Sequence, residues 1–396
     1  MRILPRWFYP LRGWCLLLVA VVLWPALGLA AEGSRAAALE EQARQLQRAG
    51  QYQEALPLAL QALQSFYQEK GLEHPATAAS LTLAGLLYLE LDALNEALPL
   101  LQRALQIRFK ALGVDHAATA ASLAYLGEVY RRQGSLEEAR PLLQRSLQIR
   151  EKVNGPEHPD TAHSLVALAL YHQDLGEEGQ AFALLTRALA IREKTLGQSS
   201  PDLAASLNLV GDYQRSRGAY QQALPLLERA QQIYDRSLGR LHPATANSLR
   251  SLGLLYLEMG FYNKAQAALE HALQVRQKAL GLEHPLAVQS LSDLGLLYTR
   301  QKEFDKAKPL LDRALAIRER RRPANHPDLA ASYNDLAVFY QTLGQLAQAE
   351  SLAQRALQVR EQALGPNHPH TLASLQTLAA LGKHSSANGC RLGGVC

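Results

Sequence analysis

The sequence predicts an all-α fold, a solenoid of eight helix-turn-helix repeats closed by one capping helix. Three observations favour this fold. A His-Pro pair recurs every 42 residues, columns of small residues keep the same step, and the apolar residues between them recur at intervals of three and four. The chain is 48% hydrophobic, which supplies a large core and excludes whole-chain disorder.

Residues 1–30 have the layout of a secretory signal peptide. Arg2, Arg6 and Arg12 precede an uncharged apolar run, and Gly28-Leu29-Ala30 resembles a cleavage site before Ala31. The alternative is a retained membrane anchor, because residues 14–31 are uncharged and 18 residues is near the minimum for spanning. We expect an exported protein, periplasmic or envelope-associated, with secretion also open. Contact with the membrane is expected only if this segment is retained.

The repeats begin after a histidine column with a constant step of 42 residues. Its members are His74, His116, His158, His242, His284, His326 and His368, with Ser200 in the remaining place; a proline follows in all but His116. Proline suits the first turn of a helix, which does not use the N–H that proline lacks. The predicted repeats lie near 36–69, 78–111, 120–153, 162–195, 204–237, 246–279, 288–321 and 330–363, with a capping helix at 371–381 and a disordered tail at 383–396.

Two further columns define each repeat. One holds only glycine or alanine, as at Gly85 and Ala337, and permits close approach of packed helices. The other is a glycine at the end of each second helix, such as Gly71 or Gly281, where we expect a left-handed cap. Pro323 replaces glycine in the seventh place, which predicts a locally altered turn there.

These columns resemble those of the tetratricopeptide (TPR) repeat. Stretches such as residues 190–197, Ala-Ile-Arg-Glu-Lys-Thr-Leu-Gly, are similar to the 42-residue repeats of kinesin light chains in an exported bacterial form. The resemblance covers about residues 36 to 382. It implies a right-handed solenoid that binds a protein or an extended peptide along its concave face.

The resemblance also implies which residues face a partner, namely those on the outward side of each first helix. These candidates are Arg131, Arg132, His163, Gln173, Asn208, Asp212, Arg215, Asn247, Arg250, Gln289, Asp293, Arg300, Asn334 and Asp335. Arginine and asparagine there suit a peptide backbone or carboxylates. The alternative is that they are only the solvated face that any soluble helix needs.

No catalytic motif is present, and we expect no enzyme, cofactor or resident metal. The histidine column cannot form one zinc site, because stacked helix pairs lie about 10 Å apart while zinc needs ligands within about 2 Å. A metal-dependent envelope enzyme on a helical scaffold stays the less favoured alternative. Cys390 and Cys396 are either a small disulfide or two unrelated thiols.

Charge argues against nucleic acid as a partner. The whole chain carries +5, but residues 1–30 hold three arginines and no acidic residue, so the rest carries only +2. The densest basic cluster, Arg318 and residues 320–322, is either an anion-binding patch or a helix end whose cations complement the helix dipole. The sequence does not indicate the oligomeric state.

Overall fold

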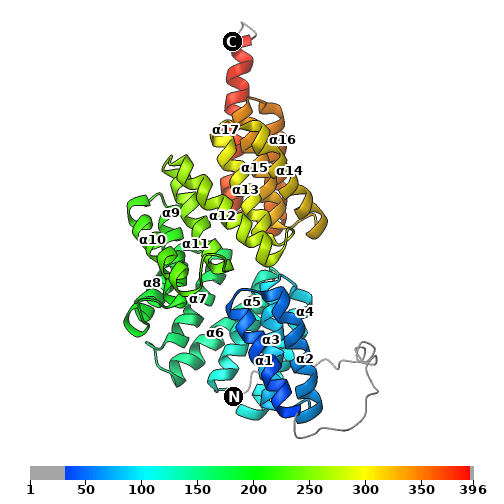
Figure 1. Ribbon diagram of the computed structural model, residues 1–396. Helices are drawn as coiled ribbons and strands as arrows, with labels where there is room; N and C mark the ends of the chain where they lie inside the picture. The colour runs from blue at the N-terminus through cyan, green and yellow to red at the C-terminus, as the bar shows by residue number, and fades with distance from the viewer. Residues whose placement is uncertain (1–31, 393–396) are drawn as a thin grey trace, which may run out of the picture.

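The computed structural model describes residues 32–392, with side chains for 35–381, and the described chain consists of helices joined by short turns (Figure 1). The first helices of the repeats are α1 (Glu32–Arg48), α3 (Pro75–Glu90), α5 (Ala117–Arg132), α7 (Pro159–Asp174), α9 (Pro201–Ser216), α11 (Pro243–Glu258), α13 (Pro285–Arg300) and α15 (Pro327–Leu343). The second helices are α2 (Tyr52–Lys70), α4 (Leu94–Leu112), α6 (Leu136–Val153), α8 (Glu178–Thr195), α10 (Tyr220–Ser237), α12 (Tyr262–Leu280), α14 (Phe304–Arg321) and α16 (Leu346–Leu364). The predicted solenoid of eight helix pairs is confirmed.

The histidine column caps the first helices. In each of its seven histidines, ring Nδ1 accepts a hydrogen bond from the backbone N–H two residues later, at 3.0–3.2 Å. The predicted starts at proline are confirmed, but the side-chain cap was not foreseen from the sequence. Since a neutral imidazole that accepts at Nδ1 carries its proton on Nε2, each ring keeps one donor for a second partner.

The glycine and alanine column lies where the two helices of a repeat touch. A Cβ added to Gly253 would come within 2.7 Å of Leu269 Cγ in the facing helix, and Gly85, Gly127, Gly211 and Gly295 meet a leucine in the same way. Two alanine members of the column, Ala43 and Ala337, face an alanine sixteen residues later instead of the leucine. Small residues are therefore present where the helix partner is bulky, as the column predicted.

The exits from the second helices differ from the expected left-handed cap. Gly71, Gly113, Gly281 and Gly365 have φ of 82–98° but ψ of 163–173°, an extended conformation that is essentially restricted to glycine. The exit before Pro323 differs from these four, since Arg322 takes an ordinary extended conformation at φ −120° and ψ 147°, but this turn is not peculiar to proline. The exit at Leu196 is similar, at φ −106° and ψ 151°.

Successive turns of the superhelix touch each other along a seam. The ring Nε2 of His284 lies 3.1 Å from the carbonyl oxygen of Glu90, and His368 Nε2 lies 3.1 Å from that of Asp174. Both contacts join residues 194 apart, so one superhelical turn takes between four and five repeats of 42. In Figure 1 the yellow helix α13 accordingly lies next to the blue and cyan helices of the first repeats.

The last helix, α17 (Pro369–Leu392), is longer than predicted. Its contacts with α16 fit the capping role, but it continues past residue 381 and projects beyond the array (Figure 1). The expected disordered tail began at 383, whereas the helix runs to Leu392, and the disorder of the tail stays a prediction. No proline interrupts this stretch, and extending an existing helix costs far less than nucleating one.

Two expectations concern parts of the chain that the structure does not describe. The export segment at 1–30 lies outside the described residues, and so does the pairing of Cys390 with Cys396, because no side chain is described after 381. Within the helices of residues 32–392, none combines the length and the apolar character needed to cross a membrane.

Candidate partner-binding strip

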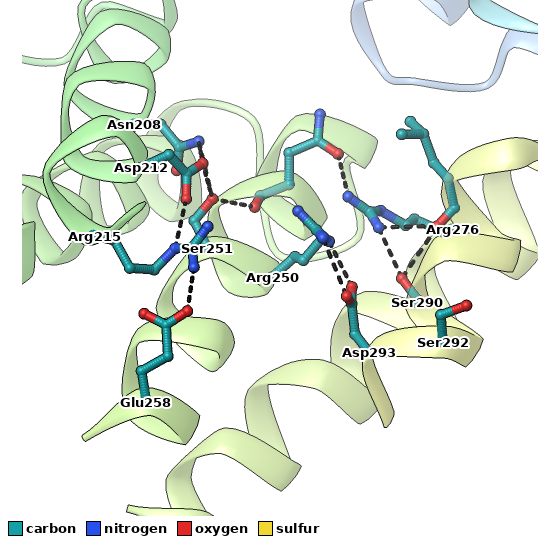
Figure 2. Close-up of polar contacts among 12 residues, drawn as sticks. Asn208, Asp212, Arg215, Arg250, Ser251, Glu258, Arg276, Ser290, Ser292 and Asp293 are labelled. Atoms are coloured by element: carbon teal, nitrogen blue, oxygen red, sulfur yellow. Dashed lines mark hydrogen bonds and ion pairs between the residues drawn. The ribbon is translucent and has the colours of Figure 1, made fainter. Parts of the chain in front are cut away.

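The fourteen candidate residues lie along the first helices of repeats three to eight, from α5 to α15. Most successive first helices touch one another, as α5 touches α7 and α13 touches α15, and the second helices pack outside them. The first helices therefore form the inner wall of the superhelix. We call the fourteen residues the inner strip, part of which is drawn in Figure 2.

Several members of the inner strip join one first helix to the next. Arg250 on α11 donates from Nε and Nη2 to the two carboxylate oxygens of Asp293 on α13, the Nη2 contact being 3.1 Å (Figure 2). Arg215 pairs with Glu258, and Asn208 donates to Ser251 Oγ at 3.2 Å. These contacts all span 43 residues, one repeat plus one position, so the inner wall carries a regular ladder of polar links.

The amino-terminal part of the strip is a compact ion-pair cluster. Arg131 pairs with Glu128 on its own helix and with Asp174 on the next, and Arg132 donates to Glu128 and to the carbonyl oxygen of Leu89. Burial would raise the pKa of Glu128, but hydrogen bonds and charge from Arg131 and Arg132 hold it at about 2. Charges that the sequence assigned to a partner are thus paired inside the chain.

Beneath the strip lies a column of arginines on the second helices, which was not predicted from the sequence. Arg150, Arg192 and Arg276 are buried, and the other members are half-buried. Arg192 Nη1 donates to Ser206 Oγ and to the carbonyl oxygen of Asp202, both at 2.9 Å. The same contact to a serine fourteen residues later recurs at Arg108, Arg150, Arg276, Arg318 and Arg360. The 42-residue step of arginine, paired with this serine, is the sequence signal that would have revealed it.

Two repeats lack this arginine, and the structure shows the consequence. Phe66 and Tyr234 occupy the arginine position, and the hydroxyls that would have received its hydrogen bond, Ser80 Oγ and Ser248 Oγ, are buried without a partner among the described residues. Serine is therefore present at this position of the repeat even where the arginine that would donate to it has been replaced.

A subset of the inner strip has no side-chain hydrogen bond within the described residues. It comprises His163, Gln173, Gln289, Asn334 and the exposed Arg300. His163 has an exposed side chain at the inner wall, but its ring nitrogens lie in a region densely surrounded by protein atoms. Burial, together with the charges of Arg150 and Arg192, lowers the pKa of His163 to about 4, so the ring is neutral at pH 7. Asn247 is also exposed, and only its Oδ1 is engaged, by Arg276 at 2.8 Å.

Asp335 is the carboxylate of the strip with the largest shift. Burial and the nearby Asp293 raise the pKa of Asp335 to about 6, although Arg318 opposes this. Asp212 accepts hydrogen bonds from Ser251 at 2.6 Å and from Asn208, so it too is committed to its neighbours. The ionic members of the strip mostly serve the array itself.

The basic cluster lies in the last turn of α14, as the helix-dipole interpretation expects, and its arginines also make specific contacts. Arg322 lies 3.1 Å from Asp92 in the second repeat and 3.4 Å from Asp328, so it joins two superhelical turns. Arg320 pairs with Glu283, and Arg321 donates to the Glu283 carbonyl oxygen at 3.0 Å. These arginines are structural links, and a small cavity of about 230 Å³ lies beside them.

No group of three or more histidine, cysteine, aspartate or glutamate side chains that could hold a metal ion occurs in the described part of the chain. The histidines of the column are one repeat apart and bind backbone groups, as the loop-shaping interpretation predicted.

Comparisons with known proteins identify the repeat. A tetratricopeptide repeat family model matches residues 34–110, 94–139, 116–194, 202–273 and 251–320, and a second one matches 329–370. No match was found among curated proteins. A Podosopora anserina putative kinesin light chain with nearly identical TPR-like repeats is 30% identical, over 52% of this chain and 98% of that one, with a TM-score of 0.41.

Two more distant structures share the fold over most of the chain. A Rap protein complexed with Competence and Sporulation Factor is 16% identical, with a TM-score of 0.56, over 89% of this chain and 99% of that one. The Cut9-Hcn1 hetero-tetramer of the APC/C is 17% identical, with a TM-score of 0.58, over 89% of this chain and 58% of that one. Since the family model matches well over half of its residues, the chain belongs to the tetratricopeptide repeat family.

Proposed function

We propose that the protein is an exported, non-catalytic scaffold that holds an extended segment of a partner protein against its inner wall. The observation that carries this proposal is the difference between the ionic and the neutral polar side chains of the inner strip. Most of its ionic side chains are paired inside the chain, Arg300 excepted, whereas His163, Gln173, Gln289 and Asn334 have no side-chain partner in the described residues.

The free groups match the chemistry of a peptide backbone. Each amide side chain offers both a donor and an acceptor, and a neutral histidine offers one of each. An extended peptide exposes one N–H and one C=O per residue, which such groups can satisfy without burying a net charge. A Rap protein of the same fold has been solved in complex with Competence and Sporulation Factor, which supports a binding role for a solenoid of this kind.

Site-specific crosslinking in cells tests this assignment. A photo-crosslinking amino acid at Gln173 should capture a discrete partner, whereas the same residue at Gln354, on the exposed side of α16, should not. Combined His163→Ala, Gln173→Ala and Asn334→Ala substitutions should remove that product while the helical circular dichroism signal stays unchanged. Equal capture from both positions, or capture that survives the triple substitution, would contradict the proposal.

Export rests on the amino-terminal sequence. Mass spectrometry of the protein purified from its native cells should give a mature start at Ala31 or Glu32. An intact amino terminus in the membrane fraction would instead favour the alternative of a membrane-anchored organiser.

A further inference from the structure

The seam between superhelical turns is made of two repeating parts. One is the histidine-proline corner that begins a first helix. The other is the turn that ends it, made of its last carbonyl group and a residue with positive φ two positions later. We call it the glycine turn, although Asp92 takes the place of glycine after α3. His284 binds the Glu90 carbonyl, and His242 binds that of Arg48 in the same way. A Cβ added to Gly50 would lie 2.3 Å from Pro243 Cδ.

The turns that end the first helices of early repeats thus contact the histidine-proline corners of late repeats. Gly176 repeats the arrangement, since its Cβ would lie 2.4 Å from Pro369 Cδ. In addition, Gln53 Nε2 donates to the Leu280 carbonyl oxygen at 3.2 Å. The seam is therefore a specific contact between two different edges of the same ribbon, formed at the corners of His242, His284 and His368. At the remaining corner, His326, the opposite turn stays open, because a Cβ on Gly134 would meet nothing within 4 Å.

Each edge has a part that no other described residue covers. His242 and His284 are 7% and 5% exposed, whereas the corners of repeats two to four, at His74, His116 and His158, are exposed. On the opposite edge Gly50 is buried, whereas the glycine turns of repeats five, six and eight are open. Gly218, Gly260 and Gly344 keep positive φ, and a Cβ on any of them would meet nothing within 4 Å.

Exposed apolar side chains gather on these same two edges. Near the free corners lie Leu72, Phe109, Leu112, Val114 and Val153, which are 37–57% exposed. Near the free glycine turns lie Phe261, Tyr262 and Leu343, which are 38–48% exposed. Leu241 and Leu282 are likewise 63% and 51% exposed, although the corners beside them already lie in the seam. Such side chains therefore border a corner whether or not it is docked, and the case for the free edges rests on the corners and turns themselves.

We propose that the chain associates head to tail, with the free corners of one copy docking onto the free glycine turns of the next. A second copy is the partner whose edge has the matching chemistry, because the seam already joins these two edges within one chain. Corners and turns both recur every 42 residues, so several contacts form at once. The two surfaces differ, so the contact is heterologous and does not close into a dimer but continues into an open chain.

Sedimentation velocity of the mature protein, residues 31–396, tests the proposal over a wide concentration range. We expect the weight-average mass to rise continuously past that of a dimer. Leu72→Lys with Val114→Lys blocks the corner edge, and Phe261→Lys with Leu343→Lys blocks the turn edge. Each pair should weaken association by about tenfold or more, since a lysine charge is costly to bury at an apolar contact. Gln354→Lys is the matched control on the outer face and should associate like the unmodified chain.

Mixing the two blocked variants gives the decisive readout. Each keeps one intact edge, so the mixture should form a dimer of the two and stop there, whereas each alone should associate at least about tenfold more weakly than the unmodified chain. A monomer at all concentrations, association unaffected by either pair, or a closed dimer that both pairs abolish without rescue on mixing would overturn the proposal. Circular dichroism of each variant shows that the repeats remain folded.

Discussion

Substitutions of His284 can separate the two roles of a corner histidine, which caps a helix and contacts the next superhelical turn. Nδ1 of His284 accepts from the Leu286 N–H at 3.2 Å, and Nε2 lies 3.1 Å from the Glu90 carbonyl oxygen. Asparagine is a good helix cap, but its shorter side chain does not reach the second turn. His284→Asn therefore keeps the cap and loses the seam contact, while His284→Ala loses both.

The expected magnitudes follow from these two contacts. A net hydrogen bond contributes about 0.5–1.5 kcal/mol, and loss of a capping side chain costs about 0.5–2 kcal/mol. Hydrogen exchange measured by mass spectrometry reports local opening, which suits a repeat array that does not unfold in two states. His284→Asn should speed exchange up to about tenfold at residues 85–93 and 281–288, and His284→Ala should speed it further.

His74 provides the matched control, because it caps α3 in the same way and contacts no second turn. His74→Asn should leave exchange unchanged, and His74→Ala should affect only the start of α3. If His284→Asn leaves residues 85–93 as protected as before, the ring does not hold the seam. If His74→Ala and His284→Ala have equal effects, the histidine column acts as a cap alone.

Three other predictions test the seam and the buried arginines. Burial lowers the pKa of His284 to about 4, below its unfolded value near 6.5, so the unfolded chain binds more protons between these pH values. The thermal stability should therefore fall as the pH is lowered from 6.5 to 4, and it should fall less in His284→Asn. Gly176→Ala and Gly218→Ala share a φ of 74°, but only at Gly176 would the Cβ meet a proline of the next turn, so its urea midpoint should fall more. Arg192→Leu should cost about 1–3 kcal/mol by leaving the Ser206 hydroxyl buried without a donor, and adding Ser206→Ala should restore part of that loss in urea titrations.

The periodic part of the structure could be predicted from the sequence because the contacts within a repeat and with the adjacent repeat depend on residues close in the sequence. Glycine at 253 predicts a close helix contact whatever lies further away, and proline after His284 predicts a helix start. The partner of His284 in the next superhelical turn could not be predicted, because it depends on how small rotations between repeats add up over 194 residues.

The inner strip was only partly predictable for the same reason. Its position on the first helices followed from the repeat, but which charges stay available depends on pairs such as Arg250 with Asp293, 43 residues apart. Spacing alone does not tell a partner-binding arginine from one that links two helices. The neutral His163 likewise depends on Arg150 and Arg192 from two different second helices.

The seam also changes how such an array is expected to respond to a ligand. In a simple solenoid each repeat contacts only its neighbours, so its pitch can change by small steps at every interface. Here α13 begins at a seam histidine and also carries Gln289 and Asp293 on the inner wall. A ligand that rotates α13 must therefore strain or break the contact with Glu90, and a broken seam contact must in turn alter ligand affinity by the same factor. Because adjacent turns are joined, occupancy of the inner wall and exposure of the seam edges are thermodynamically coupled, so a bound peptide shifts head-to-tail association if it shifts the pitch at all.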